Sequence, residues 1–173
     1  MFGSAYLLLE FFNQVGQVQG RKKLQKMIYL LKTGGSNFPF KYEYHFYGPY
    51  SAQLQSEINY LAYNGFLEEK KENDIYVYAI TEQGQKFRDK LIDCLNYTAE
   101  INRQLTELLA TQNSQFLEMV STYAFLIESG YKKDEARAKC LELKPHLQKY
   151  IDSAMDFYNT TKWVSGTKLI NLL

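Results

Sequence analysis

The sequence predicts an α+β protein that is mostly helical, and three observations lead to this fold class. In most of the 173 residues, apolar side chains recur every three or four positions, the period of an amphipathic helix. Residues 41–47 instead alternate polar and apolar side chains, which is typical of a half-buried strand. Residues 66–71 and 75–81 favour two more strands, because the short polar stretch between them suits a hairpin.

Two helices and a strand are expected in the first fifty residues. The apolar stretch 6–15 predicts a helix that ends at Gly16, and 17–20 is expected to be a turn. Residues 21–32 predict a second helix, with its lysines away from the apolar stripe. In the strand 41–47 one face carries Tyr42, Tyr44 and Phe46, and residues 48–51 are expected to turn.

A third helix is expected from Ser51, a favourable N-cap residue, to Gly65. With the hairpin that follows, the order is that of a winged helix-turn-helix domain with a small antiparallel sheet, assigned to residues 1–81. Residues 82–173 are expected to form a C-terminal helical bundle.

The helical half is expected to begin with one long connecting helix over 82–110. Its apolar stripe either packs inside the chain or forms a homodimer interface, with the dimer slightly favoured. Further helices are expected over 113–129, 134–143 and 145–158, and the tail from Lys162 is left unassigned. The residues proposed for the dimer interface are Leu91, Ile101, Leu105 and Leu108.

Composition narrows the function classes. Twenty basic and nineteen acidic residues give a net charge of +1, which argues against a polyelectrolyte binder of nucleic acid. Cys94 and Cys140 lie far apart, which fits a reducing compartment, and no apolar run approaches the ~20 residues of a membrane span. A cytoplasmic location without a membrane partner is expected.

No catalytic pattern is apparent, so the protein is expected not to be an enzyme and to need no cofactor or metal. His45 and His146 are remote in sequence, and His45 is expected to be a hydrogen-bonded structural group. Cys94 and Cys140 are expected to be inert core thiols. The zinc-type, phosphate-cradling and nucleophile-elbow motifs are all missing from the sequence.

Candidate binding residues lie on the second and third expected helices. The basic cluster at the start of the second helix would supply phosphate contacts, unless it is only a solvated face. The third helix carries polar side chains that suit base edges, but it contains no Lys or Arg and has Glu57 at its middle. The candidates are Arg21, Lys22, Lys23, Lys26, Gln53, Gln55 and Asn59.

Tyrosine is abundant, with fifteen residues in the chain. Most tyrosines near the sheet are expected to pack in it. Tyr60 and Tyr63 lie off the apolar stripe of the third helix and are the expected exposed pair, suited to a protein interface.

Residues 20–29, Gly-Arg-Lys-Lys-Leu-Gln-Lys-Met-Ile-Tyr, and 45–51, His-Phe-Tyr-Gly-Pro-Tyr-Ser, carry a resemblance to a known family. The chain resembles the YwgA-like family of small bacterial proteins. It is more distantly similar to Panacea-type domains, which include antitoxin-like proteins and share the Leu-Gln-Lys helix and the Tyr-Gly-Pro turn. This resemblance covers roughly residues 5–85. It implies a bacterial source, a winged-helix fold and no known catalytic activity, and it transfers no functional residues.

Two functions are therefore expected, in order of preference. The first is a non-catalytic regulatory or adaptor protein that binds a protein partner through the winged-helix module. The alternative is a winged-helix transcriptional regulator that binds double-stranded DNA. An enzyme that uses His45 is a third, disfavoured class.

Overall fold

Helices make up most of the chain, together with a three-stranded antiparallel sheet and a separate two-stranded hairpin, so the fold is α+β and mostly α, as predicted. The structure is a computed structural model that describes residues 2–161. In chain order, its elements are α1 (Gly3–Val15), β1 (Gln17–Gln19), α2 (Arg21–Thr33), β2 (Glu43–His45), β3 (Gly48–Tyr50), α3 (Ala52–Tyr63), β4 (Leu67–Glu72), β5 (Ile75–Ile80), α4 (Glu82–Leu95), α5 (Arg103–Ala110), α6 (Ser114–Glu128), α7 (Lys133–Leu143), the 3-10 helix η1 (Pro145–Tyr150) and α8 (Ile151–Thr161).

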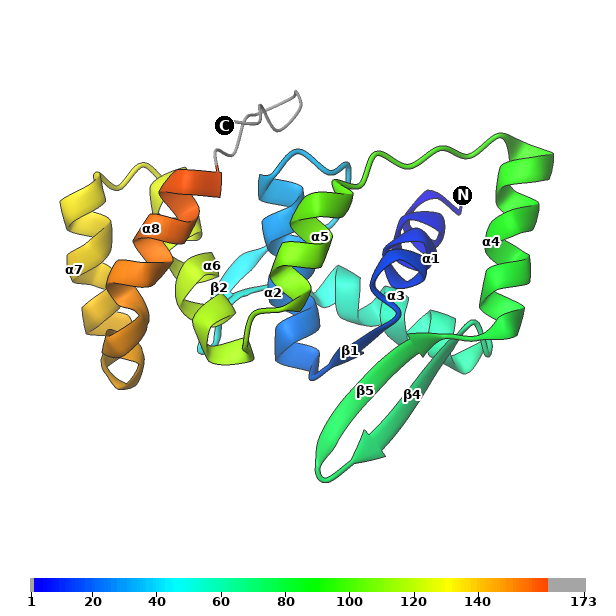
Figure 1. The fold of residues 1–173 in the computed structure, drawn as a ribbon, viewed down its shortest axis with the longest axis horizontal. Helices are drawn as coiled ribbons and strands as arrows, with labels where there is room; N and C mark the ends of the chain where they lie inside the picture. Colours follow the sequence, from blue (N-terminus) through cyan, green and yellow to red (C-terminus); the bar gives the residue numbers. More distant parts are fainter. Residues whose placement is uncertain (1, 162–173) are drawn as a thin grey trace.

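The larger sheet has the strand order β1-β5-β4, and its β4–β5 hairpin projects away from the helices (Figure 1). Its hairpin is confirmed: β4 and β5 are joined by Asn73 and Asp74, both with positive φ, the geometry of the two-residue turns that match strand twist. The turn predicted over 17–20 is wrong, because Gln17–Gln19 pairs with β5 and places Val18 opposite Tyr78. A three-residue strand is too short to show a period, so its pairing comes from the tertiary fold.

The second hairpin lies between α2 and α3. The predicted strand 41–47 is shorter, Glu43–His45, and the predicted turn at 48–51 is mostly strand, because the chain reverses at Phe46 and Tyr47 instead. Gly48 permits this reversal through its φ of +87°. Ser51 caps α3 as predicted, since its hydroxyl accepts a hydrogen bond from the Leu54 N–H at 3.2 Å.

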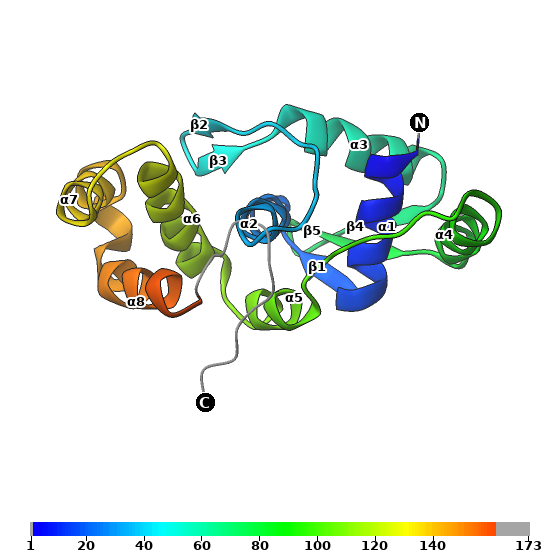
Figure 2. The ribbon, with the colours of Figure 1, turned by 90° about the horizontal axis from the view of Figure 1, so that it is seen from above.

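Helix α2 lies at the centre of the molecule, between α1, α5, α6 and the β2–β3 hairpin (Figure 2). Its residues from Leu24 to Leu31 are all buried. One hydrophobic core joins residues before and after position 81, from Leu8 in α1 to Leu117 in α6 and Ile151 in α8. Helices α4 and α7 lie at opposite ends of the molecule (Figure 1).

The single helix predicted over 82–110 is wrong. Helix α4 ends at Leu95 because Asn96 adopts a left-handed conformation, and α5 begins after Asn102, whose side chain accepts from the Leu105 N–H. Leu91, Ile101 and Leu105 are buried within the chain, which favours the intrachain alternative for these three positions. Leu108, the fourth residue of the predicted dimer interface, is 42% exposed.

The helices predicted over 113–129 and 134–143 are confirmed as α6 and α7, whereas the single helix predicted over 145–158 divides into η1 and α8. Helix α6 has Asn113 as its N-cap, and the break at Pro145 starts η1, which continues into α8. The apolar tail after 162 lies outside the described residues. Within residues 2–161, none of the helices combines the length and apolar character required to cross a bilayer.

Candidate binding pocket

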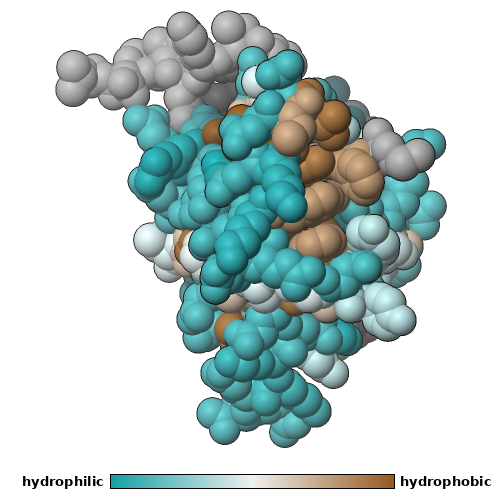
Figure 3. Space-filling model, turned by 90° about the vertical axis from the view of Figure 1, so that its right-hand side faces the viewer, coloured by the Kyte–Doolittle hydropathy of each residue, from teal (hydrophilic) through white to brown (hydrophobic). Residues whose placement is uncertain are grey.

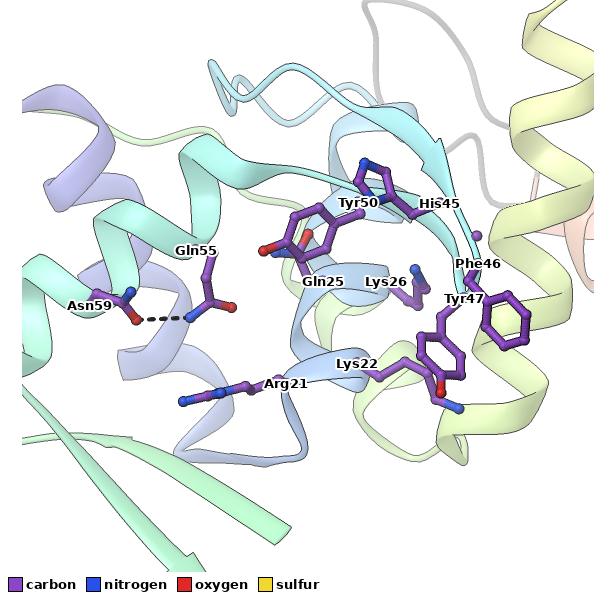
Figure 4. Close-up of a pocket in the computed structure, with 11 residues that line it drawn as sticks. Arg21, Lys22, Gln25, Lys26, His45, Phe46, Tyr47, Tyr50, Gln55 and Asn59 are labelled. Atoms are coloured by element: carbon purple, nitrogen blue, oxygen red, sulfur yellow. Dashed lines mark hydrogen bonds between the residues drawn. The ribbon is translucent and has the colours of Figure 1, made fainter.

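A pocket of about 510 Å³ opens between the N-terminal half of α2, the turn of the β2–β3 hairpin and α3 (Figure 4). It brings together five of the nine candidate binding residues, and leaves Lys23, Gln53, Tyr60 and Tyr63 outside its lining. Its lining consists of Arg21, Lys22, Gln25, Lys26, His45, Phe46, Tyr47, Gly48, Tyr50, Gln55 and Asn59.

A buried carboxylate lies behind the pocket. Glu118 of α6 is 1% exposed and accepts a hydrogen bond from Lys22 Nζ at 2.9 Å. Lys144, between α7 and η1, forms an ion pair with its other oxygen at 3.0 Å. Burial by itself raises the pKa of Glu118, but the bonds from Lys22 and Lys144 outweigh it and hold the pKa below its ordinary value. Two lysines therefore share one carboxylate.

Lys26 adds a third amine to this cluster. It was expected to face away from the apolar stripe, but it is 2% exposed, and its Nζ donates to the Pro49 carbonyl at 2.5 Å. Burial lowers its pKa to about 7, the charge of Glu118 opposes this shift, and the charges of Lys144 and Lys22 add to it. The phosphate-contact role predicted for Lys26 does not fit a side chain enclosed in this way.

The lowered pKa of Lys26 makes stability depend on pH. Between pH 7 and about 9 the unfolded chain keeps a proton that folded Lys26 has released, so the free energy of unfolding rises with pH, by about 2 kcal/mol. Lys26→Met should flatten this rise, whereas Lys86→Met, at an exposed position, should preserve it. Urea unfolding at several pH values measures both slopes; equal slopes would contradict the assignment. Above pH 9 the raised pKa of Cys140 acts in the opposite direction.

Arg21 is held over the larger sheet rather than lying free. Its Nε donates to the Tyr78 hydroxyl at 2.9 Å, its guanidinium carbon lies 3.7 Å from the Tyr76 ring centroid, and Nη2 lies 3.5 Å from Glu69. The side chain remains 47% exposed at the pocket. Lys23 donates to the Ala110 carbonyl at 2.7 Å and so points toward α5 instead.

The amide side chains in and near the pocket make different hydrogen bonds. Gln25 bonds both backbone groups of Ser51, donating at 3.0 Å and accepting at 2.9 Å, so it fixes the start of α3 against α2. Gln55 and Asn59 bond each other at 2.9 Å on the open side (Figure 4). Gln53 accepts from the Lys41 N–H and supports the hairpin connection.

Two exposed aromatic side chains, Phe46 and Tyr47, line the opening, and two more lie outside the lining on α3. Phe46 was expected on the buried face of a strand, but it is 81% exposed, and Tyr47 is 57% exposed. Lys144 donates to the Phe46 carbonyl and so ties this turn to the buried cluster. On α3, Tyr60 and Tyr63 are 48% and 92% exposed, as predicted.

Two expectations for His and Cys are corrected. His45 is 53% exposed at the pocket wall, with its ring 5.0 Å from that of Tyr50 and its Nε2 3.9 Å from Glu43, too far for a hydrogen bond. Cys94 is exposed, because α4 packs on α1 through a different face. Cys140 is buried as predicted, and burial raises its pKa to about 12, which keeps it a thiol.

Gln25, Glu118 and Lys144 are among the residues that build the pocket and that the sequence analysis missed. Glu118 offered a signal, because it lies in the mostly apolar run 116–120, where a helix buries its side chains. A charged residue within such a run indicates a buried partner of opposite charge.

Comparison with known proteins identifies the lineage of the chain. No family model matches the sequence. The uncharacterized protein YwgA of Bacillus subtilis (strain 168) is 38% identical over 159 residues, an alignment that covers 86% of this chain and 88% of YwgA. The chain therefore belongs to the YwgA family.

Proposed function

We propose that this protein is a non-catalytic regulatory adaptor that binds a protein partner through the pocket and the aromatic residues around it. The observation that carries the proposal is the exposure of Phe46 and Tyr47, two large side chains on one turn. Lys144 holds this turn against the core through a hydrogen bond to the Phe46 carbonyl. Rigid aromatic anchors beside an arginine are typical of protein interaction hot spots.

The contact module in this proposal is a winged helix formed by residues 1–81. The order α1, β1, α2, α3, β4, β5 and the antiparallel sheet β1-β5-β4 support this assignment. The β2–β3 hairpin is an addition between α2 and α3, and it supplies the aromatic turn.

The positions of the cations favour protein over DNA. Of the four basic residues predicted to contact phosphates, Lys22 is paired with Glu118, Lys23 with a backbone carbonyl, and Lys26 is buried. The β4–β5 hairpin presents a hydrophilic surface (Figure 3) whose lysines are paired, Lys70 with Glu68 and Lys71 with Asp74. A DNA-binding surface needs several cations free to replace counterions.

Double-stranded DNA binding is the second candidate, and one observation favours it. Gln55 and Asn59 are accessible on α3, the helix that would enter the major groove, and amides of this kind pair with adenine.

The test is affinity capture from a bacterial lysate with the full chain, with and without nuclease. We expect a stoichiometric protein partner that nuclease treatment leaves in place. Phe46→Ser and Tyr47→Ser should each weaken its binding about thirtyfold, the size of a hot-spot loss. Tyr131→Ser, which removes a 40% exposed ring at the α6–α7 connection, is the matched control and should leave binding unchanged.

Two results would count against the adaptor. Capture of nucleic acid alone, released by nuclease or by moderate salt, would favour the DNA-binding candidate. A protein partner that binds the Phe46→Ser, Tyr47→Ser and Tyr131→Ser variants equally well would place its contact elsewhere on the chain.

A further inference from the structure

Positive groups outnumber negative ones in and around the pocket. Arg21, Lys22 and Lys26 contribute to its wall, and no acidic residue is found among the lining residues that the structure describes. Behind the wall, Glu118 is shared between Lys22 and Lys144, so its single negative charge is already balanced. Glu69, near Arg21, lies at 3.5 Å, longer than a strong charged hydrogen bond. A cationic excess at a site partly shielded from water attracts an anion from outside the chain.

The shape of the pocket limits what this anion can be. A volume of about 510 Å³ accommodates a side chain or small group, not a helix or a duplex backbone. Tyr50 and His45 form one wall, and Gln55 and Asn59 offer neutral hydrogen-bonding groups on another (Figure 4). The positive groups are concentrated at the α2 side of the pocket and are not distributed along a groove.

We infer that this pocket receives a side-chain carboxylate from an acidic segment of the protein partner, with Arg21 as its charged contact. The inference rests on the proposed adaptor function and names the chemistry of the partner. Arg21 presents a planar fork of N–H donors, which matches a planar carboxylate, and its Nε is already fixed by Tyr78, so little side-chain freedom is lost on binding.

Charge complementarity also favours an acidic protein segment over a nucleic acid as the ligand of this pocket. A nucleic acid strand carries a phosphate on every nucleotide and gains affinity from a row of cations. The surfaces next to the pocket lack such a row of free cations: α3 contains no Lys or Arg, and the lysines of β4 are paired with acidic residues. One compact positive pocket bordered by Phe46 and Tyr47 instead fits an acidic residue next to an apolar one.

The experiment uses the full chain and a fluorescent hexapeptide, acetyl-Asp-Glu-Phe-Asp-Glu-Leu-amide. Its matched neutral peptide replaces Asp by Asn and Glu by Gln. We expect the acidic peptide to bind and the neutral one to bind at least about tenfold more weakly, since charged hydrogen bonds are lost. Arg21→Met keeps a long unbranched side chain but removes the guanidinium, and it should weaken binding of the acidic peptide by a similar factor. Arg103→Met, which removes an exposed charge on α5, should not.

Each outcome decides the inference. Equal binding of the two peptides, no binding of the acidic peptide, or equal binding to the Arg21→Met and Arg103→Met variants would overturn it. If inorganic phosphate or a single-stranded oligonucleotide displaces the labelled acidic peptide at lower concentration than the unlabelled acidic peptide does, the pocket is assigned to phosphate and the inference is overturned. In the lysate capture, a result in which Phe46→Ser abolishes binding of the partner while Arg21→Met leaves it unchanged would support the adaptor proposal and contradict the carboxylate contact.

Discussion

Glu118→Gln should destabilise the protein by about 3–5 kcal/mol, the cost of removing one partner from a buried ion pair. The amide keeps the volume of the side chain but leaves Lys22 and Lys144 without their shared negative charge. Lys26 lies in the same electrostatic cluster, so its charged form is disfavoured further. Urea unfolding at pH 7 measures the change.

The matched control for this change is Glu107→Gln on α5. Glu107 pairs with Arg103 one helical turn away, and both side chains are largely exposed, so the loss should stay below about 0.5 kcal/mol. A Glu118→Gln protein as stable as the Glu107→Gln protein would show that the three lysines do not depend on the buried carboxylate.

Local patterns in the sequence were sufficient to predict most helices. In α2 and α6 the apolar residues of each turn face the core, and the ends carry local signals such as Gly34 and Asn113, so a single segment contains all the information needed. The hairpin of β4 and β5 was predictable for the same reason, because its turn residues are adjacent in the chain.

Elements that depend on distant partners were missed. Strand β1 exists because β5, about sixty residues away, offers it an edge. The apolar spacing of 82–110 suits one helix or two equally well, and Asn96 and Asn102 decide between them through backbone conformation and capping rather than through apolar period.

The identity of several pocket residues could be predicted from the sequence, but their accessibility could not, because it depends on distant partners. Its charged and amide residues stand out on α2 and α3, so Arg21, Lys22, Lys26, Gln55 and Asn59 were found. Which lysines are free to contact a ligand depends on Glu118, 96 residues beyond Lys22 in sequence. The exposure of Phe46 depends on a turn whose position is set by Gly48 and held by Lys144.

Gly48→Ala should cost about 3 kcal/mol, because two effects add at this position. Its φ of +87° strains any residue with a Cβ atom, which accounts for about 1 kcal/mol or more. The added Cβ would also lie 2.9 Å from Thr122 Oγ1, a buried hydroxyl that donates to the Glu118 carbonyl at 2.8 Å. Either that hydrogen bond or the position of the hairpin must change.

Two further variants separate the strain from the contact. Gly130→Ala introduces a Cβ at a φ of +96° with nothing within 4 Å, so it reports the strain alone and should cost about 1 kcal/mol. Introducing Gly48→Ala into a Thr122→Ala protein removes the close contact, and its cost should then fall to that of Gly130→Ala. If the cost of Gly48→Ala is the same in both backgrounds, Thr122 does not limit the approach of the hairpin to α6. The contact between this turn and α6 would then be loose, and the rigid placement of Phe46 and Tyr47 on which the adaptor proposal depends would lose its support.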